Sequence, residues 1–203
     1  MKNSASSRLS KAERRQQLLD TALVILREEG ADRLTLGRLA ARAGVSKPIA
    51  YEHFGTRPGL LIELYKAIDA GQAEALRERL LAVPRGLEEI VSELAAAYMH
   101  CYADTSGEWH QIGAALSGSE EMDAVHQELL DSYVALFADA LRPHSDLPAG
   151  QLQLRCVGLI GAGEALSAAM VRGEATERDA AEALAALMRA SVSAKAAATA
   201  PCR

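Results

Sequence analysis

The chain has 203 residues, of which 49% are hydrophobic and 24% charged, and its formal net charge is −5. This is the composition of a globular protein with enough length for one large or two small domains. No apolar run approaches the length needed to span a bilayer, and the polar N-terminus lacks the hydrophobic core of a signal peptide. We therefore expect a cytoplasmic protein with no membrane partner.

Cys101, Cys156 and Cys202 are odd in number and form no CxxC pair, which argues against a disulfide framework and against a zinc knuckle. Alanine and leucine dominate, β-branched residues are sparse, and alternating strand patterns are absent. The sequence therefore predicts an all-α fold.

Charge is divided unevenly along the chain. Residues 1–60 hold 11 Lys and Arg against 6 Asp and Glu, a net charge of +5, whereas the remainder holds 11 basic and 21 acidic residues, a net charge of −10. A basic N-terminal part and an acidic body are compatible with a nucleic-acid partner for the N-terminal part alone.

The N-terminal part begins with a capping box. Ser10 and Glu13 are spaced to cap a helix that Gly30 ends. The apolar face of this helix contains Leu18, Leu19, Ala22, Leu23, Ile25 and Leu26. We expect this helix to support the two shorter helices that follow.

Residues 34–61 predict a helix-turn-helix. Thr35 is suited to N-cap a short helix that ends at Gly44, a residue able to take the left-handed conformation, and Val45 is the apolar anchor of such a cap. Ser46 then N-caps a second helix with Pro48 in its first turn. Two short helices joined by a tight turn containing glycine make this motif.

The second helix carries a short, mixed face suited to a major groove. Ala50 and Phe54 can bury, Lys47 can reach a phosphate or a guanine edge, and Pro48 and Ile49 offer apolar surface to a thymine methyl group. Tyr51, His53 and Arg57 are candidate phosphate contacts. The alternative is a packing motif in which Tyr51, His53 and Phe54 form an aromatic core.

The pattern resembles the DNA-binding domain of the TetR family of transcriptional regulators (TetR/AcrR type) over about the first 65 residues. The matching positions are Thr35, Leu39, Ala40, Ala43, Gly44, Val45, Ser46, Tyr51, His53, Phe54, Thr56, Arg57 and Leu60. The resemblance implies that Thr35, Ser46, Lys47, Tyr51, His53 and Arg57 contact the DNA backbone, and that Pro48 and Ile49 face bases.

Two positions depart from the usual family pattern. Arg57 stands where lysine is more common, which allows a bidentate grip on phosphate. Glu52 places an acid on the groove side, where it can either accept from a cytosine amino group or repel phosphate.

Beyond the motif, five further helices and one short segment are expected. Thr56 caps a helix that runs to Pro84, residues 87–103 form an amphipathic helix, and a short segment surrounds Trp109 to Leu116. Ser117 and Glu120 form a capping box for a helix that stops at Pro143. A helix over 149–172 and an Ala-rich helix capped by Thr176 and Asp179 end the chain.

Too many apolar and small residues lie around these last two helices for a monomer to bury. The resemblance implies that they form the four-helix bundle of a homodimer, over about 149–193, and an ordinary core hairpin is the alternative. A two-fold dimer would bind a palindromic operator in double-stranded DNA, with half-sites roughly 34 Å apart or slightly more.

The resemblance also implies a small-molecule effector bound in the larger domain. Candidate pocket residues are the larger polarisable side chains of the middle helices, namely Tyr98, Tyr102, Trp109, His110, Met122, His126, Tyr133, Phe137 and Glu164. A mostly apolar pocket favours a hydrophobic or aromatic effector.

The sequence assembles no enzymatic site, because no nucleophile with a neighbouring base and no metal cluster is evident. His100, Cys101, His110 and His126 fit no standard metal spacing, so we expect no metal and no cofactor. The prediction is a helix-turn-helix DNA-binding domain over 1–57 and an effector-binding and dimerisation domain over 58–203. The function predicted is a ligand-responsive regulator that represses, and the alternatives are a regulator without an effector or an activator.

Overall fold

The computed structural model describes residues 9–82, 86–104 and 108–192. Within these ranges the chain is all-α, as predicted, and no strand is present. The helices pack into two compact units, Met1–Asp69 with Ser106–Asp123, and Ala70–Thr105 with Ala124–Arg203. This division by packing differs from the functional boundary between residues 57 and 58, which stays a prediction.

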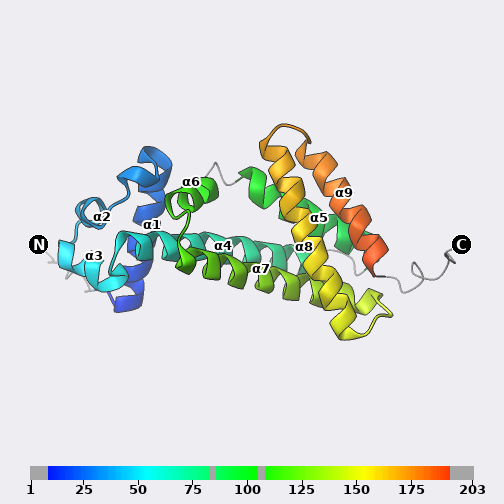
Figure 1. Ribbon diagram of the computed structural model, residues 1–203. Coiled ribbons are helices and arrows are strands. Elements are labelled where there is room, and N and C mark those ends of the chain that lie inside the picture. Colours follow the sequence, from blue (N-terminus) through cyan, green and yellow to red (C-terminus); the bar gives the residue numbers. More distant parts are fainter. Residues whose placement is uncertain (1–8, 83–85, 105–107, 193–203) are drawn as a thin grey trace, which may run out of the picture. The chain divides into compact units, whose positions relative to one another are not determined.

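The first unit begins with α1 (Lys11–Glu29), the single-turn helix η1 (Ala31–Arg33), α2 (Leu36–Ala43) and α3 (Lys47–Phe54), drawn from blue to cyan in Figure 1. The capping box of α1 is confirmed, because the Ser10 hydroxyl accepts from the Glu13 N–H while the Glu13 carboxylate accepts from the Ser10 N–H. Leu18, Ile25 and Leu26 are fully buried along α1. Burial of this face holds α1 in the core of the unit.

The long helix α4 (Arg57–Ala82) starts in the first unit and ends in the second. Thr56 caps it as expected, because its hydroxyl accepts from the Gly59 N–H at 3.1 Å. Pro84, the expected end of this helix, lies outside the described residues.

The first unit also contains α6 (Glu108–Ala115) and the start of α7 (Glu120–Leu141). The expected capping box of Ser117 and Glu120 is wrong. Ser119 stands directly before α7, and its hydroxyl accepts from the Met122 N–H at 3.3 Å. Gly118, with φ of 81°, turns the chain between Ser117 and the helix, so Ser117 lies too early to cap it.

The second unit contains α5 (Leu87–Asp104), the rest of α7, the short η2 (Arg142–His144), α8 (Ala149–Val171) and α9 (Glu177–Ser191). α9 packs along both α5 and α8, which lie beside it in Figure 1. The capping box of Thr176 and Asp179 at the start of α9 is confirmed. The core of this unit includes Leu94, Met99, Phe137, Leu152 and Met188.

One face of the α8 and α9 pair is apolar and exposed in the single chain. On α8 it includes Leu154 and Val157, with exposed fractions of 72% and 52%, and on α9 it includes Leu187, at 46%. Small exposed residues continue the same face at Gly158, Gly161, Ala165, Ala183, Ala186 and Ala190. We call these nine residues the α8–α9 face.

By length and composition α8 is also able to cross a membrane, with a mean hydropathy of 1.4. The expectation that no apolar stretch approaches that length is therefore wrong for α8. Glycine and alanine make up much of it, so the apolar stretch is not evident from large side chains. Core helices of soluble proteins can be equally long and apolar, so the length and hydropathy of α8 carry no conclusion about a membrane.

Candidate nucleic-acid interface

A glycine corner joins α2 to α3. Gly44 takes the left-handed conformation, with φ of 69° and ψ of 32°. The Val45 N–H donates to the Ala40 carbonyl at 3.0 Å, and the Gly44 N–H donates to the Ala41 carbonyl at 3.4 Å. These are the two hydrogen bonds of a Schellman cap, which sets the direction in which the chain leaves α2.

The helix α3 is anchored on one side and open on the other. Ala50 and Phe54 are buried, as predicted, so the opposite side of α3 faces outward. The predicted DNA-contacting residues Ser46, Lys47, Pro48 and Tyr51 are exposed, Tyr51 to 54%, and Ile49 and His53 are partly exposed. Glu52 is also exposed on this helix. The alternative of an aromatic core fits Phe54 but not Tyr51.

The start of α3 carries groups that can reach an anion. Ser46 N-caps α3 by its extended backbone, and its hydroxyl makes no capping hydrogen bond. Lys47 extends along α2, where its Cε lies 3.7 Å from the position that a Cβ on Gly37 would take. Thr35 caps that end of α2, accepting from the Arg38 N–H at 3.1 Å. The side chain of Lys47 thus lies beside the N-terminus of α2, which carries a partial positive charge.

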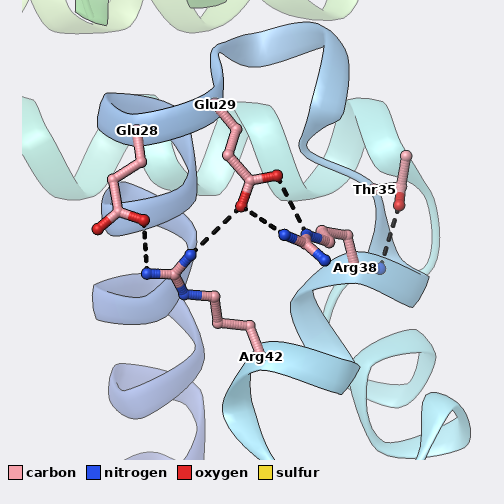
Figure 2. A network of polar contacts seen from close by, with 5 residues as sticks. All are labelled: Glu28, Glu29, Thr35, Arg38 and Arg42. Carbon is pink, nitrogen blue, oxygen red and sulfur yellow. Dashed lines mark hydrogen bonds and ion pairs between the residues drawn. The ribbon is translucent and has the colours of Figure 1, made fainter.

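Two arginines of α2 link this helix to α1, and sequence reasoning did not select them (Figure 2). The guanidinium of Arg38 donates two hydrogen bonds to the Glu29 carboxylate, at 2.9 and 3.1 Å, and Arg42 pairs with both Glu28 and Glu29. The hydrogen bond from Arg38 is the main cause that lowers the pKa of Glu29 below its usual value. Residue spacing within α2 does not predict these ion pairs, because the two glutamates lie on α1.

Arg57 faces inward. Its Nη2 donates to the Ala31 carbonyl at 2.7 Å, and its Nε donates to the Leu34 carbonyl at 3.0 Å. One guanidinium therefore binds a carbonyl of η1 and the carbonyl of the residue before Thr35, and holds this segment against the start of α4. In this structure Arg57 positions the start of α2, and a contact from Arg57 to a phosphate stays a prediction.

Arg15 supports the end of α3 from α1. Its guanidinium donates to the His53 carbonyl at 3.2 Å, pairs with Glu63, and lies 5.3 Å from the centre of the Phe54 ring. A cation over an aromatic ring and a bonded carbonyl hold this end of the helix in place. The orientation of α3 is thus fixed at its start by the glycine corner and at its end by Arg15.

The predicted effector residues fall into separate groups. Tyr98 contacts the rings of Tyr102, Tyr133 and Phe137, with ring centres 5.5–5.7 Å apart. His126 and Glu164 form a second group, joined at 3.2 Å. Both groups belong to the second unit, whereas Met122 is buried in the first. The side chains of Trp109 and His110 lie outside the described part of the chain.

Among the residues that the structure describes, no group of three or more His, Cys, Asp or Glu side chains is placed to hold a metal ion.

Comparison with known proteins finds a family match for part of the chain. Residues 18–64, which contain α2 and α3, match the family described as bacterial regulatory proteins, tetR family. The segment that carries the helix-turn-helix is therefore similar to the TetR family.

A relative of this chain is the HTH-type transcriptional regulator BetI of Escherichia coli O45:K1, which is 36% identical over 77 residues. That match covers 38% of this chain and 40% of BetI, so the chain spans less than half the length of the curated relatives it matches. The likeness in sequence is thus concentrated in one part of the protein.

Solved structures of TetR-like fold are similar over most of the chain. A TetR-like transcriptional regulator from Rhodococcus sp. RHA1 is 23% identical with a TM-score of 0.61, covering 90% of this chain and 97% of that one. The regulator FadR from Bacillus subtilis, solved with stearoyl-CoA, is 17% identical with a TM-score of 0.58, covering 87% and 97%. At these identities the likeness shows that the two-part fold is shared.

Proposed function

We propose that this chain is a TetR-family transcriptional regulator that binds double-stranded operator DNA through α3. The observation that carries the proposal is the geometry of α3, which is anchored by Ala50 and Phe54 and presents Lys47, Pro48 and Tyr51 to solvent. A helix held in this way can enter the major groove with its N-terminal residues at the base edges. The predicted role of Ile49 is to contact a thymine methyl group from the same face.

The first unit has the charge for this role. Within residues 1–60 the net charge is +5, against −10 for the rest of the chain. Lys47 and the N-terminus of α2 offer a cation and N–H donors to one phosphate. Arg38 and Arg42 are partly exposed and add positive charge on α2, although each is already paired with glutamate. We therefore place them outside the predicted contact set.

We further propose that the protein acts as a homodimer through the α8–α9 face. Exposed Leu154, Val157 and Leu187 form an apolar face whose burial against a second copy would remove it from water. The small residues between them allow the helices of two copies to approach closely. Two copies related by a two-fold axis would present two α3 helices to a palindromic operator.

A small-molecule effector is the proposed regulator of DNA binding. Among proteins of similar fold, the multidrug binding protein EbrR, 17% identical with a TM-score of 0.65, was solved with imidazole. A protein from Saccharomonospora viridis, 15% identical with a TM-score of 0.61, was solved with choline. These ligands differ widely, so they support a ligand-binding role and do not identify the ligand of this chain. We propose repression because the TetR family, which the chain resembles, consists mostly of repressors; activation is the alternative.

A mobility-shift assay tests the proposed function. The purified full chain is titrated onto duplex fragments from upstream of its own gene at low ionic strength, with a scrambled fragment as the control. Retardation of a fragment containing a palindrome supports the proposal. Failure to retard any fragment from the locus overturns it.

A further inference from the structure

The hydroxyl of Tyr98 is buried without a hydrogen-bond partner among the described residues. Tyr98 lies on α5 and is only 3% exposed. Folding costs free energy when it removes a hydroxyl from water and gives it no new hydrogen bond. Native proteins rarely leave such a group unsatisfied, so this hydroxyl marks a position where a bound molecule can supply the missing partner.

Three other aromatic rings contact the ring of Tyr98. Tyr102 lies one turn further along α5, with ring centres 5.5 Å apart, and Tyr133 and Phe137 of α7 meet the Tyr98 ring edge-on, at 5.7 and 5.6 Å. The rings offer apolar surface and electron-rich faces. Tyr102 is partly exposed, so the cluster reaches from the core to the surface of the unit.

α8 approaches the same ring at Gly163. A Cβ on Gly163 would lie 2.5 Å from Cε1 of Tyr98, so only glycine permits this close approach. The next residue, Glu164, is half-exposed, and its carboxylate lies 3.2 Å from Nε2 of His126 on α7. The close contact at Gly163 thus brings a carboxylate to the edge of the tyrosine cluster.

Glu164 adds a negative charge near the Tyr98 hydroxyl. Burial is the main cause that raises the pKa of this hydroxyl far above its usual value, and the neighbouring Tyr102 and Glu164 raise it further. Burial alone disfavours an anion and a cation alike, whereas the carboxylate of Glu164 disfavours only a bound carboxylate or phosphate. That carboxylate, together with the aromatic faces, favours a cation.

We propose that Tyr98, Tyr102, Tyr133 and Glu164 form the effector site of this protein, and that its effector is a protonated amine with an apolar body. The ammonium N–H donates to the Tyr98 hydroxyl oxygen, its charge pairs with the Glu164 carboxylate, and the apolar body lies against the rings. This inference rests on the proposed function as a ligand-responsive regulator. Entry requires Tyr102 or Tyr133 to rotate, because these rings contact Tyr98 in the ligand-free protein, and this rotation would couple binding to a change in α5 or α7.

Isothermal titration of the full chain with matched probes tests the class of ligand. The probes are 2-phenylethylamine and hexylamine, their neutral counterparts 2-phenylethanol and hexan-1-ol, and their anionic counterparts phenylacetate and hexanoate, all at pH 7. We expect each amine to bind roughly tenfold more tightly than its alcohol, and the carboxylates to bind most weakly. Equal affinities for amine and alcohol, tighter binding of a carboxylate, or no binding of either amine overturns the inference.

Three variants test which residues carry the preference. Glu164→Gln removes the charge and is expected to abolish the preference for amine over alcohol, whereas Tyr98→Phe removes only the hydroxyl and should weaken amine binding roughly tenfold. Glu174→Gln is the control, because Glu174 lies in the exposed turn after α8, paired with Arg172. An unchanged preference in Glu164→Gln that melts like the parent contradicts the assignment.

The same probes, added to the mobility-shift assay, separate this inference from the proposed function. Release of DNA by the amines and not by the alcohols supports both. A protein that retards its operator but neither binds nor responds to the amines leaves the regulator standing and removes the amine site. A protein that retards no DNA removes the proposed function, whereas the calorimetry still decides whether the amine site exists.

Discussion

Arg57 and Ala31 are joined by a hydrogen bond of 2.7 Å, from the guanidinium at the start of α4 to the carbonyl of η1. On the other side of the same residue, the Ala31 N–H donates to the Gln111 side chain of α6 at 3.3 Å. η1 is thus held between α4 and α6, and it leads directly to the residue that caps α2. The position of the predicted DNA-binding helices depends on this support.

Arg57→Ala is therefore expected to destabilise the first unit as well as weaken DNA binding. Two hydrogen bonds from a charged donor to carbonyls are lost, and we expect a decrease of about 2 kcal/mol in the free energy of unfolding, measured by urea titration followed by circular dichroism. Arg57→Lys is the matched control, because it keeps the charge but cannot bond both carbonyls in the same way. Unchanged stability in Arg57→Ala would contradict the supporting role.

Lys47→Ala is expected to behave differently. Lys47 is exposed, so its removal should leave the melting temperature unchanged and weaken binding to every DNA sequence. The slope of log affinity against log salt concentration should flatten by about one unit, because one phosphate contact is lost. Ile49→Ala is the comparison, since it should change the preferred half-site in a selection experiment; a salt slope unaltered by Lys47→Ala would remove Lys47 from the phosphate contacts.

The sequence predicted the DNA-binding helices well because their signals are local. Gly44 and Val45 adopt the cap that their types and order indicate, and Ser10, Thr35, Ser46, Thr56 and Thr176 all stand at helix starts, as expected. Local signals are less decisive at the start of α7. The spacing of Ser117 to Glu120 fits a capping box, but the turn at Gly118 places Ser119 directly before the helix, and Ser119 caps it.

The inward orientation of Arg57 and the contact of Gly163 with Tyr98 could not be predicted in the same way. Each joins residues far apart in the chain, 26 positions in the case of Arg57 and Ala31. An arginine in a basic segment is equally compatible with a phosphate or with two carbonyls until the fold brings those carbonyls near. The pairing of small Gly163 with a large ring likewise depends on how α5 and α8 pack.

Gly163→Ala tests that packing. A methyl group would lie 2.5 Å from the Tyr98 ring, so the ring or α8 must move, and we expect a loss of about 1–2 kcal/mol in the stability of the second unit by thermal or urea unfolding. Gly71→Ala on α4 is the matched control, since nothing lies within 4 Å of its added methyl group. That control should raise stability by up to about 1 kcal/mol; a similar gain in Gly163→Ala would disprove the close contact.

Leu154→Glu tests the α8–α9 face. We expect sedimentation velocity to show a monomer in place of a dimer, because a charge would be buried between copies. Leu81→Glu is the control, because Leu81 on α4 is 85% exposed and lies outside that face. A dimer that persists in Leu154→Glu, at concentrations where the parent is dimeric, would place the interface elsewhere.

The Glu29 network predicts a dependence of stability on pH. The folded-state pKa of Glu29 is lowered, mainly by the Arg38 hydrogen bond, so its contribution is fully present above the ordinary carboxyl pKa of 4.5 and is lost as pH falls through the lowered value. The difference in melting temperature between the parent and Glu29→Gln should therefore shrink as pH is lowered from 7 to 3. A difference that is constant over this range would show that the charge of Glu29 does not stabilise the contact between α1 and α2.

Recognition of DNA by α3 of a dimeric protein is tested by a mobility-shift titration with the parent and Lys47→Ala side by side. We expect the parent to retard a palindromic fragment from its own locus, and Lys47→Ala, folded and dimeric, to do so only at lower salt or higher protein concentration. Equal retardation by both proteins, or none by the parent at low ionic strength, would contradict this recognition.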